Sequence, residues 1–204
     1  YAAIIIEEIA RTNASGIGFP LHSDIVVPYV EEFALPHRKR EWLPRMAKGE
    51  IITAIAMTEP GMGSDLKAMK THARRDGADW IINGSKTFIS NGQNAGLVIV
   101  ACKTDPGAGR KGISLICVEE GTPGFTKGRN LEKIGMHAAD TSELFFDDVR
   151  VPADNLLGEE NAGFSYLIRN LPQDRLVIAI RAAASMETML QKTIDYAKDR
   201  RVFN

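Results

Sequence analysis

The stretch that decides the fold is Met57-Thr58-Glu59-Pro60-Gly61-Met62-Gly63-Ser64-Asp65, which follows the apolar run 51–56. The run predicts a buried strand, and Pro60-Gly61 predicts a tight turn at its end. The two glycines carry no Cβ, so the main chain there can approach a flat or phosphorylated ligand closely. Thr58 and Ser64 add hydroxyl groups that both donate and accept hydrogen bonds. Taken alone, these residues favour an ordinary surface turn between strands.

The second informative stretch is Trp80-Ile81-Ile82-Asn83-Gly84-Ser85-Lys86-Thr87-Phe88-Ile89-Ser90-Asn91. An Asn-Gly pair between short apolar segments is typical of a β-hairpin, so we expect strands 79–83 and 86–90 joined by a turn at Asn83-Gly84. Together the two stretches resemble the flavin-binding signature of the acyl-CoA dehydrogenase family, T-E-P-G-x-G-S-D followed by W-x-x-N-G-x-K-x-x-I-[ST]-N. A third block, which runs from Gly135 to Phe146 and on through Val149-Arg150-Val151-Pro152, is similar to the same family. The resemblance covers almost the whole chain.

Composition excludes several classes of protein. The 204 residues are 44% apolar and 25% charged, as in an ordinary globular protein. The net charge of −1 gives no electrostatic footprint for nucleic acid. The sequence has no uninterrupted apolar run of about 18 residues, so we expect no membrane span.

Cysteine and histidine usage points to a reducing compartment and away from a metal site. Cys102 and Cys117 lie in apolar, strand-like runs and are expected to be reduced core thiols. The histidines, which we interpret as non-catalytic because they lack ligand spacing, are His22, His37, His72 and His137. We therefore expect no metal, and a location in the bacterial cytoplasm or the mitochondrial matrix. The chain opens inside a helical pattern, so a targeting segment upstream is not excluded.

The order of secondary structure is predicted to be helices, then strands, then helices. Helical patterns cover 1–11, 22–33 with a kink at Pro28, and 38–48. Short strands are expected at 51–57, 69–75, 79–83, 86–90, 97–103, 113–119 and 143–149. Helix returns after Gly158, with one segment at 162–170 and a long helix at 173–200 that begins at Pro172.

The fold class that follows is a multi-domain α+β protein. We expect the end of an N-terminal helical domain at 1–50, a central antiparallel β-barrel or sandwich at 51–157 that binds flavin and acyl-CoA, and the start of a C-terminal helical bundle at 158–204. The family resemblance implies this same order, and it implies that further helices of a complete member are missing here.

The resemblance implies FAD-dependent α,β-dehydrogenation of a fatty acyl-CoA thioester, of medium to long chain, to the trans-2-enoyl-CoA. In such a reaction a base removes an α proton while the β hydrogen leaves as hydride to the flavin. The implied partners are the acyl-CoA substrate, an electron-transferring flavoprotein and further copies of the chain in a dimer or tetramer. Two alternatives stay open: an acyl-CoA oxidase-like enzyme that uses oxygen, and a non-catalytic relative that binds a partner.

The family pattern also implies which residues contact FAD. They are Ile55, Ala56, Met57 and Thr58 beside the ring, Ser64 in the glycine-rich turn, Phe88, Ile89 and Ser90 along its face and N5 edge, and Arg200 at the pyrophosphate of a neighbouring subunit. A guanidinium suits a pyrophosphate because it presents two parallel donors. Phe88 stands where many members have Trp, and Ile55 stands where many have an aromatic residue. Val202 and Asn204 depart from the usual Thr and Gly, which makes Arg200 the weaker prediction.

The substrate contacts implied by the resemblance are Ser64, Thr104, Asp105, Pro172, Gln173, Asp174 and Arg175. Asp174 is the expected catalytic base, since the long-chain and isovaleryl branches place a glutamate just before the arginine that matches Arg175. The aspartate is one methylene shorter. In the first turn of a helix that starts at Pro172, the helix dipole would lower the pKa of Asp174, while desolvation by a bound acyl chain would raise it and should dominate. The alternative is a structural acid paired with Arg175.

Overall fold

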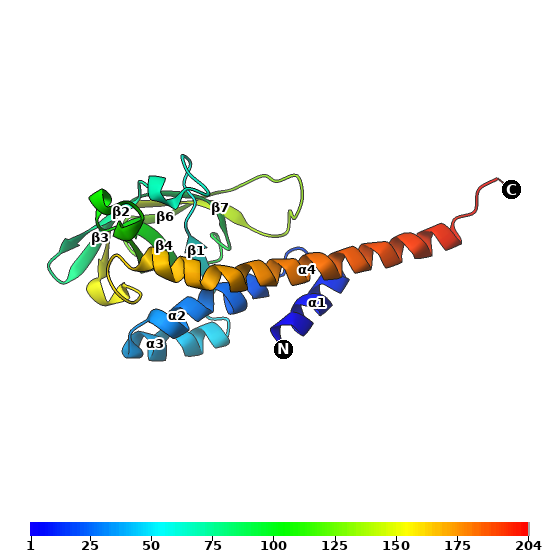
Figure 1. Ribbon diagram of the computed structural model, residues 1–204, viewed down its shortest axis with the longest axis horizontal. Helices are drawn as coiled ribbons and strands as arrows, with labels where there is room; N and C mark the ends of the chain where they lie inside the picture. Colours follow the sequence, from blue (N-terminus) through cyan, green and yellow to red (C-terminus); the bar gives the residue numbers. More distant parts are fainter. Residues whose placement is uncertain (204) are drawn as a thin grey trace.

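The computed structural model describes residues 1–203 and has three successive parts: helices, a curled β-sheet and one long helix (Figure 1). The helices are α1 (Ala2–Thr12), η1 (Leu21–Val26), α2 (Val27–Phe33), α3 (Pro36–Ala47) and α4 (Gly163–Asp199). The strands are β1 (Thr53–Ala56), β2 (His72–Asp76), β3 (Asp79–Ser90), β4 (Leu97–Lys103), β5 (Ile113–Glu119), β6 (Phe125–Asn130) and β7 (Thr141–Pro152). Short turns of helix, η2 (Leu66–Ala68), η3 (Pro106–Gly112) and η4 (Ala153–Asn155), join some of them. The predicted fold class is confirmed.

The seven strands form one sheet in the order β1-β4-β2-β3-β7-β6, with β5 also paired to β4. Most pairs are antiparallel, as predicted. However, β1 pairs with β4 in parallel, from Thr53 opposite Leu97 to Ala56 opposite Val100, and β2 meets β4 in parallel at one position. Parallel neighbours need a long crossover, and here β2 and β3 lie in the connection between β1 and β4.

Strand β4 separates two apolar cores, which is why it is buried on both faces. Leu97 and Ile99 belong to the core shared with the helices, whereas Val98 and Val100 belong to the core enclosed by the sheet. Alternate side chains of a strand point to opposite faces, so a strand between two cores is apolar throughout. Trp42 anchors the first core and Trp80 the second; burial of each large side chain contributes about 1.5–3 kcal/mol.

The hairpin predicted at Asn83-Gly84 is wrong, because β3 continues through these residues from Asp79 to Ser90. The Asn83 side chain reaches β7 instead: its Nδ2 donates to Asp148 Oδ1 at 2.9 Å, and its Oδ1 accepts from the Asp148 backbone N–H at 2.9 Å. Gly84 has a φ of 146°, and a Cβ there would lie 2.4 Å from Thr71 Oγ1. The pair therefore accommodates a close approach of another segment, and the hairpin turn lies at Gly77, between β2 and β3.

The interruption predicted at Pro172 is also wrong, since α4 runs unbroken from Gly163 to Asp199 with Pro172 inside it. Asp174 consequently lies in the interior of a helix and not in its first turn, so the helix dipole does not act on it as predicted. In the N-terminal part, the kink expected at Pro28 falls between η1 and α2, and Pro28 lies in the first turn of α2.

Candidate functional site

The first two motifs lie side by side at the ends of β1 and β3. The Thr87 N–H donates to the carbonyl of Thr58 at 2.9 Å, which joins the residues after β1 directly to β3. Met57 and Thr58 are partly buried, whereas Ser64 lies in the exposed turn that follows. The structure thus brings together two segments that the sequence separates.

Phe88 is turned out of β3 and is the exposed aromatic side chain of the second motif. Its φ is 57°, in the left-handed region that bulky residues rarely adopt, and 66% of its surface is exposed. The pairing of β3 with β7 shifts register between Lys86 and Ile89, so Phe88 sits in a bulge, a device that redirects side chains near functional sites. Ile89 points into the sheet-enclosed core, and Ser90 is exposed. The bulge therefore presents Phe88 and Ser90 to a ligand but not the side chain of Ile89.

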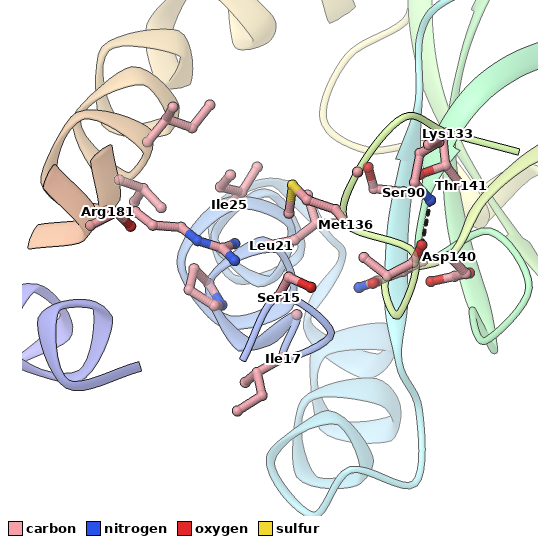
Figure 2. A pocket seen from close by; sticks show the side chains of 18 of the residues that line it. Ser15, Ile17, Leu21, Ile25, Ser90, Lys133, Met136, Asp140, Thr141 and Arg181 are labelled. Atoms are coloured by element: carbon pink, nitrogen blue, oxygen red, sulfur yellow. Dashed lines mark hydrogen bonds between the residues drawn. The ribbon is translucent and has the colours of Figure 1, made fainter. Parts of the chain in front are cut away.

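A cavity of about 740 Å³ lies between the N-terminal segment, the edge of the sheet and α4 (Figure 2). Its walls are mainly apolar and come from segments far apart in sequence: Ile17, Leu21 and Ile25 from the N-terminal part, Met136 from the third motif, and Val177, Ile178 and Ala182 from α4. Ser90, Lys133, Asp140, Thr141, Arg181 and Ser185 supply polar groups at its margin. Figure 2 shows Ser90 and Asp140 on one side of it and Arg181 on the other.

The third motif forms the loop before β7 that closes the sheet side of this cavity. Asp140 fixes the loop, because its Oδ2 accepts a hydrogen bond of 2.7 Å from the Gln93 backbone N–H. Lys133 Nζ donates to the carbonyl of Ala139 within the same loop. The family resemblance includes this motif, but none of its residues was predicted to belong to the site. The match of the block to the family was the signal that could have indicated their role.

Asp174 lies on the same face of α4 as the cavity-lining residues Val177 and Ile178, one turn before them. It is half-buried, and desolvation raises the pKa of its carboxyl to about 6. Within the described residues its Oδ1 has no hydrogen-bond partner, and no ion pair joins it to Arg175. Burial first, and then the charge of Asp174, raises the pKa of Tyr29 on α2. Asp174 is thus an unpaired carboxyl one helical turn from the residues of α4 that line the apolar cavity.

Several predicted residues do not converge on this cavity. Of the predicted flavin contacts, Ser90 lines it, whereas Ile55, Ala56, Met57, Thr58, Ser64, Phe88 and Ile89 do not. Thr58 is therefore not part of the wall of this cavity, whereas Ser90 is. The Thr104 hydroxyl lies 2.6 Å from Ser114 Oγ and 2.6 Å from Asn161 Oδ1, so its hydrogen bonds are made inside the fold.

The remaining predicted substrate contacts are also directed elsewhere. Asp105 accepts a hydrogen bond from Gly107 N and caps η3. Pro172, Gln173 and Arg175 are exposed on α4 beside the half-buried Asp174. Of the predicted substrate contacts on this helix, Asp174 alone has its side chain turned inward.

Arg200 follows the C-terminal end of α4, far from the cavity. At about 1.5 Å per residue it lies on the order of 40 Å along the helix from Asp174. Its guanidinium stacks over the Tyr196 ring at 5.7 Å and is exposed to solvent. Figure 1 shows this end of α4 extending away from the rest of the chain, so Arg200 cannot reach the site of its own subunit. The predicted departure at Asn204 lies outside the described residues.

Three further observations concern metal binding, membrane helices and cysteines. Among residues 1–203, no group of three or more His, Cys, Asp or Glu side chains is placed to hold a metal ion. In the same range, no helix combines the length and apolar character needed to cross a membrane. Cys102 and Cys117 are free and buried, and burial raises the pKa of the Cys102 thiol to about 12.

Comparison with known families identifies the architecture. Family models of the acyl-CoA dehydrogenase N-terminal, middle and C-terminal domains match residues 1–50, 54–149 and 161–204, in that order. The chain belongs to the acyl-CoA dehydrogenase family. The three motifs read from the sequence lie in the middle-domain match and the segment that follows it.

Individual relatives give the same result. The chain is 52% identical to a mitochondrial long-chain specific acyl-CoA dehydrogenase of Sus scrofa, over 99% of this chain and 47% of the relative. It is 54% identical to a solved acyl-CoA dehydrogenase of Geobacillus kaustophilus, with a TM-score of 0.97 over 100% of this chain and 54% of that one. A solved structure described as an electron transferring flavoprotein of Acidaminococcus fermentans is 34% identical, with a TM-score of 0.93 over 98% of this chain and 53% of that one. The chain thus spans about half the length of these relatives.

The residues at the β1 and β3 ends fit a flavin. Phe88 offers an exposed aromatic face held by a strained backbone, and Ser90 offers a hydroxyl two residues further on. Gly61 and Gly63 leave open space where a Cβ would stand, so a phosphorylated ligand can approach the main chain there. Ser64, Phe88 and Ser90 are exposed to solvent.

Proposed function

We propose that the complete protein catalyses FAD-dependent α,β-dehydrogenation of a fatty acyl-CoA thioester, giving the trans-2-enoyl-CoA. The observation that carries this proposal is Asp174, an unpaired carboxyl with a pKa raised to about 6 beside an apolar cavity. A general base works best when its pKa lies near the operating pH, and burial is the usual means of raising a carboxyl to that range. At neutral pH most Asp174 side chains are ionised and ready to accept a proton.

The chain's own residues divide the task between them. Asp174 takes the α proton of the thioester onto its carboxylate. Residues 55–58, Phe88 and Ser90 would hold FAD, which when bound would supply the acceptor for the β hydrogen and its electron pair. The walls of the cavity exclude water from the acyl chain and fix its position relative to Asp174. Geometry matters here because a displacement of about 1 Å in a reacting group can cost on the order of 10²-fold in rate.

The proposed substrate class is a medium-to-long acyl chain. The apolar lining from the N-terminal part and α4 suits an alkyl chain, and the 52% identity to a long-chain specific relative supports that choice. We further propose Arg200 as a contact to the FAD pyrophosphate of a neighbouring subunit. Its distance from Asp174 supports this role, and with it a dimer or tetramer.

An electron-transferring flavoprotein is the proposed electron acceptor. The similarity to the Acidaminococcus fermentans structure supports a link to such proteins. Relatives occur in mitochondria and in bacteria, and the buried free thiols suit a reducing compartment. We therefore propose the mitochondrial matrix or the bacterial cytoplasm as its location.

The test is an anaerobic titration of the full-length, flavin-loaded protein with saturated acyl-CoAs of graded chain length. We expect the yellow flavin absorbance to be lost stoichiometrically, with the tightest response at medium-to-long chains. Protein that purifies without flavin, or flavin that no acyl-CoA bleaches, would contradict the proposal and favour a binding role. Admitting air to the reduced enzyme separates the remaining alternative, since fast reoxidation indicates an oxidase.

A further inference from the structure

A buried ion pair between Glu59 and Lys86 links the first two motifs, and neither residue has a role in the proposed chemistry. Lys86 is 0% exposed and Glu59 is 5% exposed, and Lys86 Nζ lies 3.0 Å from Glu59 Oε1. Burial raises the pKa of Glu59, but the Lys86 charge and hydrogen bonds from Thr71 and Lys70 outweigh it, so the pKa lies below its usual value. An ion pair removed from water this completely rarely adds stability over an apolar pair, which raises the question of its function.

The contacts of the pair are directed at the flavin-binding segment. Lys86 Nζ also donates to the carbonyl of Met57 at 2.9 Å, and the next residue of β3, Thr87, donates its N–H to the carbonyl of Thr58 at 2.9 Å. Two successive carbonyls after β1 are therefore held by two successive residues of β3. The bulged residue Phe88 comes directly after them.

Glu59 fixes the pair from the other side. Its Oε2 accepts the Lys70 backbone N–H at 2.7 Å, and its Oε1 accepts the Thr71 backbone N–H at 2.9 Å. Thr71 in turn lies against Gly84, where a Cβ would meet its side chain. The ion pair is thus the point at which three segments meet: 57–59, 70–71 and 84–87.

We propose that Lys86, held in place by Glu59, is a positioning residue for the flavin site: through the Met57 carbonyl it fixes the Met57-Thr58 main chain relative to Phe88 and Ser90. This inference rests on the proposed function only in assuming that this surface binds the flavin. The two motifs must present one continuous surface, and the Lys86 contact sets their separation. A neutral side chain at position 86 would leave the Met57 carbonyl buried without its charged donor.

The test compares variants that break the ion pair in different ways, in the full-length protein. Glu59→Gln removes the acid but leaves the Lys86 contact to Met57, whereas Lys86→Met removes that contact. The double variant Glu59→Gln/Lys86→Met leaves no unpaired buried charge but still lacks the donor to Met57. Folding is followed by circular dichroism and urea unfolding, and FAD affinity and the visible flavin spectrum are measured where each variant is folded.

A positioning role predicts that stability and flavin binding separate. Glu59→Gln should lose stability and bind FAD as tightly as the native protein. The double variant should regain stability relative to Lys86→Met, yet bind FAD on the order of tenfold more weakly with a shifted spectrum, because a hydrogen bond from a charged donor is lost.

A double variant that regains both stability and native flavin binding would overturn the inference and leave a purely structural ion pair. If Lys86→Met alone does not fold, the double variant against Glu59→Gln decides the question. Failure of the native protein to bind FAD overturns the proposed function as well, whereas native flavin binding that Lys86 does not affect overturns this inference alone.

Discussion

The two halves of α4 differ sharply although they form one helix. In the first half, Leu167 and Val177 are buried and Asp174 faces inward. Three large apolar side chains of this half, Ile168, Leu176 and Ile178, remain exposed. In the second half, Met186, Met189 and Leu190 are among the large apolar side chains that are exposed. Figure 1 shows the first half lying along the body of the protein and the second half extending beyond it.

This difference indicates that the two halves of the helix have different packing partners. The first half lines the cavity of its own subunit and carries the proposed base. The second half ends just before Arg200 and has an apolar surface that the described residues do not cover. Burial of such a surface is a strong driving force for contact with other segments. Buried side chains thus anchor the first half of α4 to this chain, whereas we expect the second half to pack against a neighbouring segment.

Matched leucine substitutions give the largest expected contrast between these halves. In the chain of residues 1–204, Leu167→Ala should lower the free energy of unfolding by about 2–5 kcal/mol, because it removes a buried side chain and leaves a cavity. Leu190 is 62% exposed, so Leu190→Ala should change the free energy of unfolding by less than about 0.5 kcal/mol. Urea unfolding measures both.

The same pair of variants sharpens the comparison in the full-length protein. There we expect Leu190→Ala to become costly as well, since the remaining chain or a second subunit covers the second half. If both substitutions lowered the free energy of unfolding of the 1–204 chain equally, the two halves would not differ as described. That result would indicate that the short chain associates through the surface of the second half.

The pH dependence of stability tests the first half with a smaller effect. The folded pKa of Asp174 is about 6, above the value of about 3.9 in an unfolded chain, so the folded state binds more protons between these values. The contribution of this group to stability is therefore lost as pH rises from about 4 to 6. Discounted for partial exposure, the loss is about 1–2 kcal/mol.

Asp174→Asn removes this titration and supplies the control. Above about pH 7 the variant of the flavin-free protein should be more stable than the native protein, and near pH 4 the two should be equal. A stability difference that does not change with pH would place Asp174 in an ordinary solvated environment and remove the main support for its role as a base.

Local patterns predicted some elements well. The strands at 97–103 and 113–119 agree with β4 and β5, because an apolar run between turn signals has few other solutions. Contacts between residues far apart in the sequence could not be predicted from these local patterns. The approach of Thr71 to Gly84 and the Asn83 bonds to Asp148 are made across the fold, and they turn a hairpin signal into a bulge in a continuous strand.

The site shows the same division. The family resemblance predicted Asp174, Phe88 and Ser90 as site residues, and these remain predictions. The cavity between the N-terminal segment, the third motif and α4 depends on how three parts of the chain pack, which local patterns do not show. Proline is unfavourable inside a helix by about 3 kcal/mol, which made a break at Pro172 the local prediction. Packing of the first half of α4 against the sheet and helices outweighs this cost, and it places Asp174 mid-helix.

The most direct test of the account is the rate at which an acyl-CoA bleaches the flavin of the full-length Asp174→Asn protein under anaerobic conditions. FAD should bind as in the native protein, and bleaching should slow by on the order of 10³-fold, since a general base contributes about 10²–10⁴-fold. Asp174→Glu, which keeps a carboxylate, should retain bleaching. Bleaching by Asp174→Asn at the native rate would show that another group removes the proton and would contradict the account.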